Sequence, residues 1–274
     1  MNSEARDLTS PNFLFVCGAA RSGTTAMATL LNCHPEIAVG IERYKNVKPK
    51  DLGKHLFTKE RFFDFRATDT NVRDPEIYAQ LEKKFSQIRL VGDKVPRYYT
   101  RYAELFAAFP GCVVIFMLRD IHAVASSWNT RAVRKKNRTH PGDGWSENDD
   151  YIKAVEQWNS ALRHTMRFKK KFGERLIVVE YEKLFSGDIE LFKSIIGQLG
   201  LEFSDALAAD FRRKTQNWET LSKKERLEYE GQRQYIEGRA DMRTYERLKN
   251  IGNGNYEPSG GALNWLRSVL HLQN

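Results

Sequence analysis

The sequence predicts a three-layer α/β fold, with helices on both faces of a central parallel sheet and a helical portion at the C-terminal end. Short apolar runs alternate with segments of helical spacing along most of the 274 residues. This alternation is typical of βαβ units. No internal repeat, low-complexity tract or convincing linker interrupts it. We therefore expect a single domain over residues 1–274, with a core in 12–200 and a helical, turn-rich portion in 201–274.

The expected elements follow one another in a regular order. Five apolar runs predict strands, at 13–18, 36–40, 88–92, 112–118 and 175–180. Segments with apolar residues at helical spacing lie between them, at 24–33, 75–85, 101–109, 122–133 and 146–172. Gly173 is a stop signal for the last of these helices. Beyond residue 188 the pattern becomes helical, and the capping box "SKKE" at 222–225 predicts one charged helix that runs to about residue 248.

Composition favours a folded protein without a membrane span. Hydrophobic residues make up 41% of the chain and aromatic residues 12%, which is typical of a globule rather than a disordered chain. The polar N-terminus "MNSEARDLTSPN" has no signal-peptide core, and the apolar run 112–118 is too short to cross a bilayer. Cys17, Cys33 and Cys112 lack CxxC spacing and lie in apolar surroundings. We expect buried, reduced thiols in a cytoplasmic protein with no transmembrane segment.

The net charge of +9 indicates that the protein attracts anions. The densest basic stretches, 131–140, 167–175 and 212–214, are scattered and lack interleaved aromatic residues. This pattern favours solvated helix faces over a nucleic-acid interface, and we expect no nucleic-acid partner. A smaller polyanionic ligand would account for part of the excess charge.

The segment "GAARSGTT" at residues 18–25 has the glycine spacing of a phosphate-binding loop. Gly18 and Gly23 keep the G-x-x-x-x-G pattern, and the loop joins an apolar run to a helical segment. Such a loop turns successive backbone N–H groups inward, at the positive end of the following helix, and so binds anions. An ordinary strand-to-helix turn is the alternative, but here the glycine spacing, a cation and hydroxyl groups coincide.

The cation of this loop occupies a distinctive place. In a nucleoside triphosphatase a lysine bridges the terminal phosphates, and the following Ser or Thr holds Mg²⁺. Thr24 stands at that lysine position, and Arg21 lies inside the loop instead. Thr24 and Thr25 add hydroxyl donors. The arrangement suits a 5′-phosphate that carries one further anionic group and is bound without a metal ion.

Two segments in order resemble sulfotransferases that use 3′-phosphoadenosine 5′-phosphosulfate (PAPS). The run "ARSGTTAMATLLNCHPE" resembles their 5′-phosphosulfate-binding loop, and its core followed by His-Pro is especially similar to the tyrosylprotein and carbohydrate branches. The run "VVIFMLRDIHAVASSW" resembles their 3′-phosphate motif, with Arg119 at a strand end and Ser127 eight residues later. An arginine fork and a serine hydroxyl at such a junction can converge on one phosphate. The resemblance implies that the 5′-phosphosulfate is bound by Arg21, Ser22, Gly23, Thr24 and Thr25.

Three further segments extend the resemblance over most of residues 12–200. The segment "GDKVP" is similar to the family's lysine-containing strand end and places Lys94 near the transferred group. In "VVEYEKL", Tyr181 corresponds to a family tyrosine near the nucleotide. In "GIERYK", Glu42 matches the catalytic glutamate of the tyrosylprotein branch.

Each of these three assignments has a structural alternative. Lys94 could be a surface lysine at a strand end, and Tyr181 could be an aromatic side chain packed beneath the sheet. Glu42 could merely form an ion pair with Arg43 or Lys45.

The chain also departs from the small-molecule branch of the family. Many of its members carry a tryptophan that stacks on adenine directly after the Thr-Thr pair, where this chain has Ala26. Their histidine base has no equivalent here, and we interpret His34 and His122 as structural or capping residues. The C-terminal Arg-Lys-Gly of that branch is absent, and Lys249 is a candidate to reach the 3′-phosphate instead.

The resemblance implies a P-loop NTPase-like fold and in-line transfer of the sulfuryl group from PAPS to an acceptor hydroxyl, leaving 3′,5′-diphosphoadenosine. Glu42 would act as general base, while Arg21 and Lys94 would stabilise the leaving oxygen. No metal is implied. The alternatives are a divergent P-loop kinase or NTPase, with Asp120 as its Mg²⁺ ligand, and a non-catalytic nucleic-acid binder.

The acceptor is left open by the sequence. Residues 43–75 and 129–150 are polar, basic and dotted with aromatics, and we expect them to border the acceptor site. They do not distinguish a glycan, a tyrosine, a lipid or a small metabolite.

Overall fold

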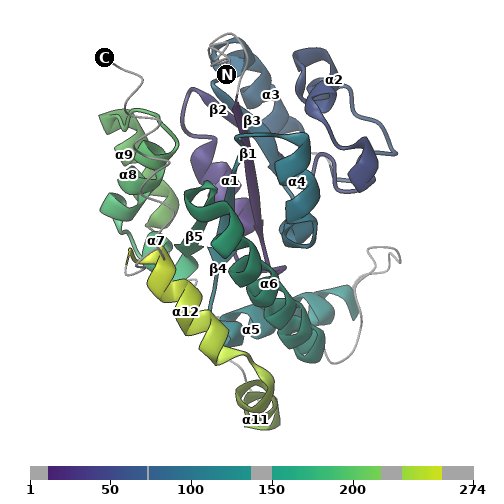
Figure 1. Cartoon of the computed structure of the whole chain (residues 1–274), viewed down its shortest axis with the longest axis vertical. Helices are drawn as coiled ribbons and strands as arrows, with labels where there is room; N and C mark the ends of the chain where they lie inside the picture. The colour runs from purple at the N-terminus through teal and green to yellow at the C-terminus, as the bar shows by residue number, and fades with distance from the viewer. Residues whose placement is uncertain (1–11, 73, 137–149, 217–229, 255–274) are drawn as a thin grey trace.

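The computed structural model describes residues 12–72, 74–136, 150–216 and 230–254 (Figure 1). Five strands form one sheet in the order β2-β3-β1-β4-β5, and all four neighbouring pairs are parallel. The strands are β1 (Asn12–Gly18), β2 (Ile37–Ile41), β3 (Leu90–Lys94), β4 (Val113–Leu118) and β5 (Leu176–Glu180). Each lies within two residues of a predicted strand, so the five strand predictions are confirmed.

Alternate residues of each strand enter two separate cores, one on each face of the sheet. In β1, Leu14 and Val16 belong to one core, and Phe15 and Cys17 belong to the other. The first core also takes residues of α1 (Thr24–Leu31), α8 (Ile189–Gln198) and α9 (Asp205–Thr215). The second takes residues of α4 (Tyr102–Ala108), α5 (Ile121–Lys136) and α6 (Asp150–Phe172). In Figure 1, α8 and α9 lie to the left of the sheet and α4 to its right. The three-layer prediction is confirmed, because side chains of a strand point alternately to opposite faces.

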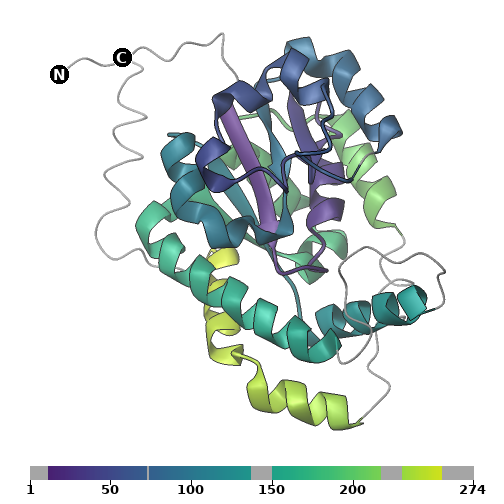
Figure 2. The same ribbon diagram turned by 90° about the vertical axis from the view of Figure 1, so that its right-hand side faces the viewer.

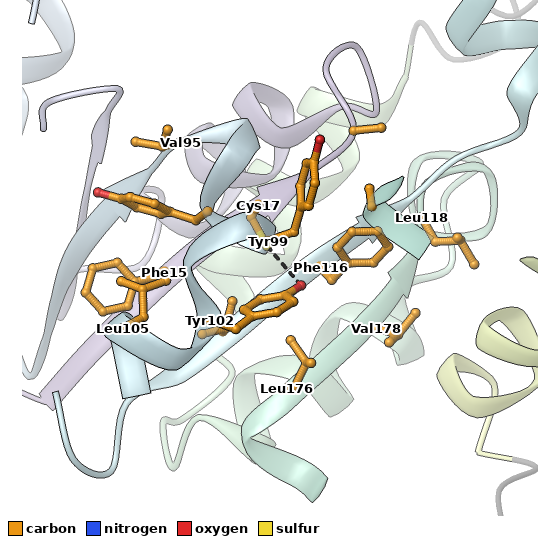
Figure 3. Packing of buried hydrophobic residues seen from close by; sticks show 14 of the residues in the cluster. Phe15, Cys17, Val95, Tyr99, Tyr102, Leu105, Phe116, Leu118, Leu176 and Val178 are labelled. Carbon is orange, nitrogen blue, oxygen red and sulfur yellow. Dashed lines mark hydrogen bonds between the residues drawn. The ribbon is translucent and has the colours of Figure 1, made fainter. Parts of the chain in front are cut away.

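The core on the α4 side contains a polar contact (Figure 3). The Tyr102 hydroxyl lies 3.3 Å from Cys17 Sγ and 2.9 Å from Thr165 Oγ1 of α6. Burial raises the pKa of the Cys17 thiol to about 12, so it stays protonated at neutral pH. Cys112 is also buried, but Cys33 is half-buried, and all three cysteines are free thiols. That the thiols are reduced stays a prediction, and the prediction that all three are buried is wrong for Cys33.

The remaining described helices connect and flank these layers. They are α2 (Lys59–Phe63), α3 (Pro75–Lys84), α7 (Tyr181–Phe185), α11 (Glu230–Arg239) and α12 (Met242–Gly252). Short 3₁₀ turns are η1 (Pro49–Asp51), η2 (Lys54–Phe57), η3 (Phe85–Gln87), η4 (Pro96–Arg101) and η5 (Gly173–Arg175). Within the described residues, no helix is both long enough and apolar enough to span a bilayer.

The described residues of the C-terminal portion are mainly helical, but the prediction of one helix running to about residue 248 is wrong. Helix α11 ends at Arg239, and the side chain of Asp241 caps α12 by accepting a hydrogen bond from Thr244 N. The Asp241 N–H donates to Asn159 Oδ1 of α6 at 2.8 Å. This contact, which a local pattern cannot reveal, fixes the break between the helices. Figure 2 shows α11 and α12 in yellow-green next to α6, which both contact. The predicted capping box at 222–225 lies outside the described residues.

Candidate active site

The candidate site lies where the carboxyl ends of the five parallel strands meet. The phosphate-binding loop follows β1, Glu42 follows β2 and Lys94 ends β3. Arg119 follows β4, and Tyr181 follows β5. Because the strand order is β2-β3-β1-β4-β5, Glu42 and Lys94 lie on one side of the loop, and Arg119 and Tyr181 lie on the other. Ligands of α/β proteins bind at this edge of the sheet.

Glycine is required in the loop for a steric reason. Gly23 has φ of +82°, and a Cβ atom there would lie 2.2 Å from Cδ2 of the Tyr181 ring. At Gly18 a Cβ atom would lie 2.7 Å from the Met117 carbonyl oxygen. Arg21 also has a positive φ, 75°, which is a strained conformation for a residue with a side chain. The loop therefore holds a specific backbone shape immediately before α1 begins.

The loop contains hydrogen-bond donors that an anion would satisfy. The Ser22 hydroxyl is buried, the residue being only 1% exposed, and has no hydrogen-bond partner among the described residues. Helix α1 begins at Thr24 with Gly23 as N-cap and without a side-chain cap, so N–H groups of its first turn are left for another acceptor. An oxyanion bound in the loop would satisfy both. The side chain of Thr24 is buried, whereas that of Thr25 is exposed.

The structure brings both parts of the proposed 3′-phosphate motif to Arg21. Arg21 Nε donates to Ser127 Oγ at 2.9 Å, and Arg119 Nη1 donates to the Arg21 carbonyl oxygen at 2.8 Å. The Arg119 guanidinium also lies over the Tyr181 ring, 4.1 Å from its centroid. Trp158 Nε1 donates to the Arg119 carbonyl oxygen at 2.8 Å, which holds the strand end in place. These groups, distant in sequence, form one cluster on the β4–β5 side of the loop.

On the β2–β3 side, Glu42 is held by two cations. Its Oε1 lies 3.0 Å from Lys94 Nζ, and its Oε2 lies 3.5 Å from Lys45 Nζ. Burial by itself would raise the pKa of Glu42, but the two ammonium groups outweigh burial and lower the pKa below its usual value. Glu42 is therefore ionised at neutral pH. Its backbone has φ of 54°, so Glu42 and Arg21 are the two non-glycine residues with positive φ in the described part of the chain.

Asp93, a residue that our sequence reasoning missed, holds the turn that carries Glu42. The Asp93 carboxylate accepts hydrogen bonds from Arg43 N and Tyr44 N, both at 2.9 Å, and Tyr98 Oη donates to it at 3.3 Å. Burial raises the pKa of Asp93 to about 6, although these donors act in the opposite direction. No local pattern in the sequence marks Asp93 for this role, because its partners Arg43 and Tyr44 follow a different strand.

The structure decides between the two partners suggested for Glu42. Lys45 does form an ion pair with it, as expected for one alternative. Arg43 instead points into the protein, is fully buried, and forms an ion pair with Asp69 at 3.0 Å. The Glu42 side chain is 27% exposed, so it remains accessible while it is paired.

The other sequence candidates have mainly structural contacts. Lys249 Nζ lies 2.8 Å from Glu180 Oε1, so its charge already has a partner, and its contact with the 3′-phosphate stays a prediction. His34 bonds the Glu202 carbonyl oxygen through Nε2 at 3.0 Å, which agrees with a structural role. Asp120 Oδ1 accepts from His122 N at 2.9 Å and from the next N–H, so it caps α5.

A cavity of about 510 Å³ lies on the Glu42 side of the loop. Its lining includes Glu42 and, from the segment 43–75, Lys45 and Asn46. None of the residues predicted to bind the donor lines it. An apolar part of the wall is formed by Ala20, Val95, Pro96, Tyr98 and Trp128. The cavity is thus a candidate acceptor site. The segment 129–150 is also expected to border the acceptor, but its residues 137–149 lie outside the described part of the chain.

Metal coordination would need a cluster of suitable donors. In the described part of the chain, no group of three or more His, Cys, Asp or Glu side chains is placed to hold a metal ion. The expectation that no metal takes part stays a prediction.

Comparison with known proteins identifies relatives of the chain. The model of the Sulfotransferase family matches residues 11–205. Protein-tyrosine sulfotransferase 2 of Gallus gallus is 26% identical over 204 residues, which cover 71% of this chain and 52% of that protein. Protein-tyrosine sulfotransferase A of Caenorhabditis elegans is 27% identical over 186 residues, which cover 64% of this chain and 46% of that protein. The chain spans about half the length of these curated relatives.

A solved structure supports the fold. The sulfotransferase domain from the curacin biosynthetic pathway is 17% identical, and the match covers 90% of this chain and 99% of that chain, with a TM-score of 0.52. At this identity the likeness shows the fold alone, which is the P-loop NTPase-like α/β fold expected from the sequence.

Proposed function

Because the chain belongs to the sulfotransferase family, we propose that it transfers the sulfuryl group of PAPS to an acceptor hydroxyl. One observation carries the proposal: the phosphate-binding loop lies between the buried Arg119 and the Glu42 carboxylate, which borders a cavity. A donor nucleotide and an acceptor would therefore lie on opposite sides of one loop, which in-line transfer requires.

The donor nucleotide would be held by hydrogen-bond donors and cations of the loop and of the cluster around Arg21. The loop N–H groups and the Ser22 hydroxyl would bind the 5′-phosphosulfate, with Thr24 and Thr25 at the start of α1. Arg119 and Ser127, joined through Arg21, would bind the 3′-phosphate. Bound PAPS supplies the activated sulfuryl group and a phosphate leaving group. The Tyr181 ring would support the site by packing against the loop and Arg119.

Glu42 would remove the proton of the acceptor hydroxyl. Its carboxylate is ionised, partly exposed and at the edge of the cavity, as a general base must be. Lys94 ends β3, which lies next to β1, the strand that precedes the phosphate-binding loop, and its ammonium group contacts Glu42. Together with Arg21, it would stabilise negative charge on the leaving oxygen. The Lys94–Glu42 ion pair keeps both groups in place before a substrate binds.

The kinase or NTPase alternative has less support in this site. Thr24 stands in place of the phosphate-bridging lysine, and Asp120, its candidate Mg²⁺ ligand, caps α5. A cytoplasmic location is also part of the proposal, supported by the three free cysteines.

Calorimetry tests the proposal without knowledge of the acceptor. We expect 3′,5′-diphosphoadenosine to bind without Mg²⁺ and at least 100-fold more tightly than ATP, because two separate phosphate sites contribute. The variant Arg119→Ala should weaken the diphosphoadenosine but change adenosine 5′-phosphosulfate little, since the latter lacks a 3′-phosphate. Binding of ATP that requires Mg²⁺, together with no binding of the diphosphoadenosine, would favour the kinase reading instead.

A further inference from the structure

The cavity beside Glu42 is lined by an excess of positive charge. Its described lining contains one carboxylate, Glu42, and four cationic side chains, which are Lys45, Arg97, Arg101 and Lys153. These cations come from three separate parts of the chain: the turn after β2, the 3₁₀ turn η4 and the helix α6. The fold, and not a local run of basic residues, assembles them around one cavity.

The charge of Glu42 is already balanced inside the site. Lys94 Nζ lies 3.0 Å from one carboxylate oxygen of Glu42, and Lys45 Nζ lies 3.5 Å from the other. Arg101 Nη1 donates to the carbonyl oxygen of Val47 at 2.9 Å, which satisfies a donor but does not neutralise the charge. The positive charge of Arg101 therefore remains available to a ligand.

Arg97 and Lys153 contribute two more positive charges to the rim. Both side chains are exposed, and neither forms an ion pair with any described residue. They belong to η4 and α6, two elements that pack against each other. Val95, Pro96 and Trp128 add an apolar surface to the wall of the same cavity. A ligand with an apolar body and an anionic group matches both parts.

We propose that the acceptor is a hydroxylated anion, whose hydroxyl group faces Glu42 while its carboxylate, phosphate or sulfate group lies against Arg97, Arg101 and Lys153. This inference rests on the proposed function, because it assigns the cavity to the acceptor. It adds a specificity that general sulfuryl transfer does not require. With a neutral acceptor, these three positive charges would have no ion-pair partner among the described residues of the wall.

A matched pair of probes isolates the charge of the acceptor. The anion 4-hydroxyphenylacetate and the neutral 4-hydroxyphenylacetamide have nearly the same shape. We expect calorimetry on the protein loaded with 3′,5′-diphosphoadenosine to show at least tenfold tighter binding of the anion at low salt. Raising the salt concentration from about 0.05 M to 0.5 M should reduce this preference, because exposed charges are screened. Equal affinity for the two probes, or no measurable binding of either, would overturn the inference.

Substitutions of Arg97 and Lys153, at the rim of the cavity, test which residues cause the preference for the anionic probe. Arg97→Gln and Lys153→Gln should each lower the anion-to-amide affinity ratio by roughly threefold to fivefold, as for exposed charge pairs. The exposed α6 residue Lys170 provides a matched control: Lys170→Gln removes the same charge about 25 Å along the helix from Lys153 and should leave the ratio unchanged. An unchanged ratio in both rim variants would refute the assignment.

The binding of the nucleotide separates this inference from the proposed function. Wild type and all three variants should bind 3′,5′-diphosphoadenosine equally well, because none of the substituted residues is among the predicted donor-binding residues. Intact nucleotide binding without an anion preference would refute the anionic acceptor alone. Loss of nucleotide binding in the wild type would refute the proposed function itself.

Discussion

Replacing Glu42 by glutamine separates its charge from its shape. Glutamine keeps the length of the side chain and one oxygen that can accept a hydrogen bond from Lys94, now 3.0 Å away. It removes the negative charge that also pairs with Lys45 and the basicity needed to take a proton. The strained backbone of the turn, φ of 54°, is the same for both residues.

The expected loss of stability is small compared with the loss of rate. Lys94 is 1% exposed and Glu42 is 27% exposed, so their ion pair is intermediate between a surface pair and a buried one. We therefore expect Glu42→Gln to lower the free energy of unfolding by about 1–2 kcal/mol. Turnover should fall by roughly 10²- to 10⁴-fold if Glu42 is the general base, which corresponds to about 3–5 kcal/mol of activation free energy.

The assay combines three measurements on the same protein. Single-turnover consumption of PAPS with an acceptor found by screening reports the chemical step, calorimetry reports affinity for 3′,5′-diphosphoadenosine, and urea denaturation reports stability. Lys45→Gln is the control, because it disturbs only the weaker ion pair of Glu42 and should cost less than tenfold in rate. Near-normal turnover in a folded Glu42→Gln variant would refute the role of Glu42 as base.

The pH dependence of turnover gives an independent check on Glu42. Burial raises the pKa of this carboxyl, but Lys94 and Lys45 outweigh burial and hold the pKa below its usual value. A base with a lowered pKa stays ionised until the pH falls below that pKa. Wild-type turnover should therefore lose little to protonation of Glu42 between pH 8 and pH 6. An acid limb centred near pH 6 that disappears in Glu42→Gln would contradict the electrostatics described above.

Three further substitutions test the surroundings of the site. Gly23→Ala should destabilise the fold by about 2–4 kcal/mol and weaken nucleotide binding at least tenfold, since its Cβ atom would overlap the Tyr181 ring. The control is Gly111→Ala, which has a similar φ of +84° but open space around the Cβ position and should therefore show the backbone cost alone. Equal losses of stability in the two variants would exclude the overlap. Asp93→Asn should change how stability depends on pH, as urea denaturation will show. Because burial raises the pKa of Asp93 from 3.8 to about 6, its contribution to stability is full below pH 3.8 and is lost as the pH rises through 6. Between pH 3.8 and pH 6, the free energy of unfolding of the wild type should fall by up to about 3 kcal/mol relative to that of the variant. Parallel profiles of unfolding free energy against pH would contradict this. Arg119→Lys should weaken nucleotide binding by about tenfold, because lysine cannot both stack on Tyr181 and donate to the loop carbonyl; unchanged calorimetric affinity would remove Arg119 from the donor site.

Local patterns in the sequence were sufficient to predict the five strands and the loop. The strands were recognisable because each is a short apolar run buried on both faces, as in a parallel sheet covered by helices. Gly18 and Gly23 were recognisable because their backbone positions leave no room for a side chain. Such requirements act within a few residues, and the amino-acid types alone therefore express them.

Long-range contacts were beyond the reach of those patterns. The break before α12 depends on Asn159, which lies 82 residues away from Asp241 along the chain. Asp93 was missed because its partners, Arg43 and Tyr44, follow a different strand. Neither contact has a local sequence signature, since buried polar groups must find partners wherever the fold places them.

By itself, the sequence determined the α/β class, the phosphate-binding loop and the residue types available at each strand end. The tertiary structure alone decided which of these strand ends are neighbours. The order β2-β3-β1-β4-β5 places Lys94 against Glu42 and brings Ser127 to Arg21, 106 residues apart. It also assembles the cations of η4 and α6 around the cavity beside Glu42. The physical reason is that residues far apart in the chain meet only after the two cores bury the faces of the sheet, and that packing is a property of the whole chain.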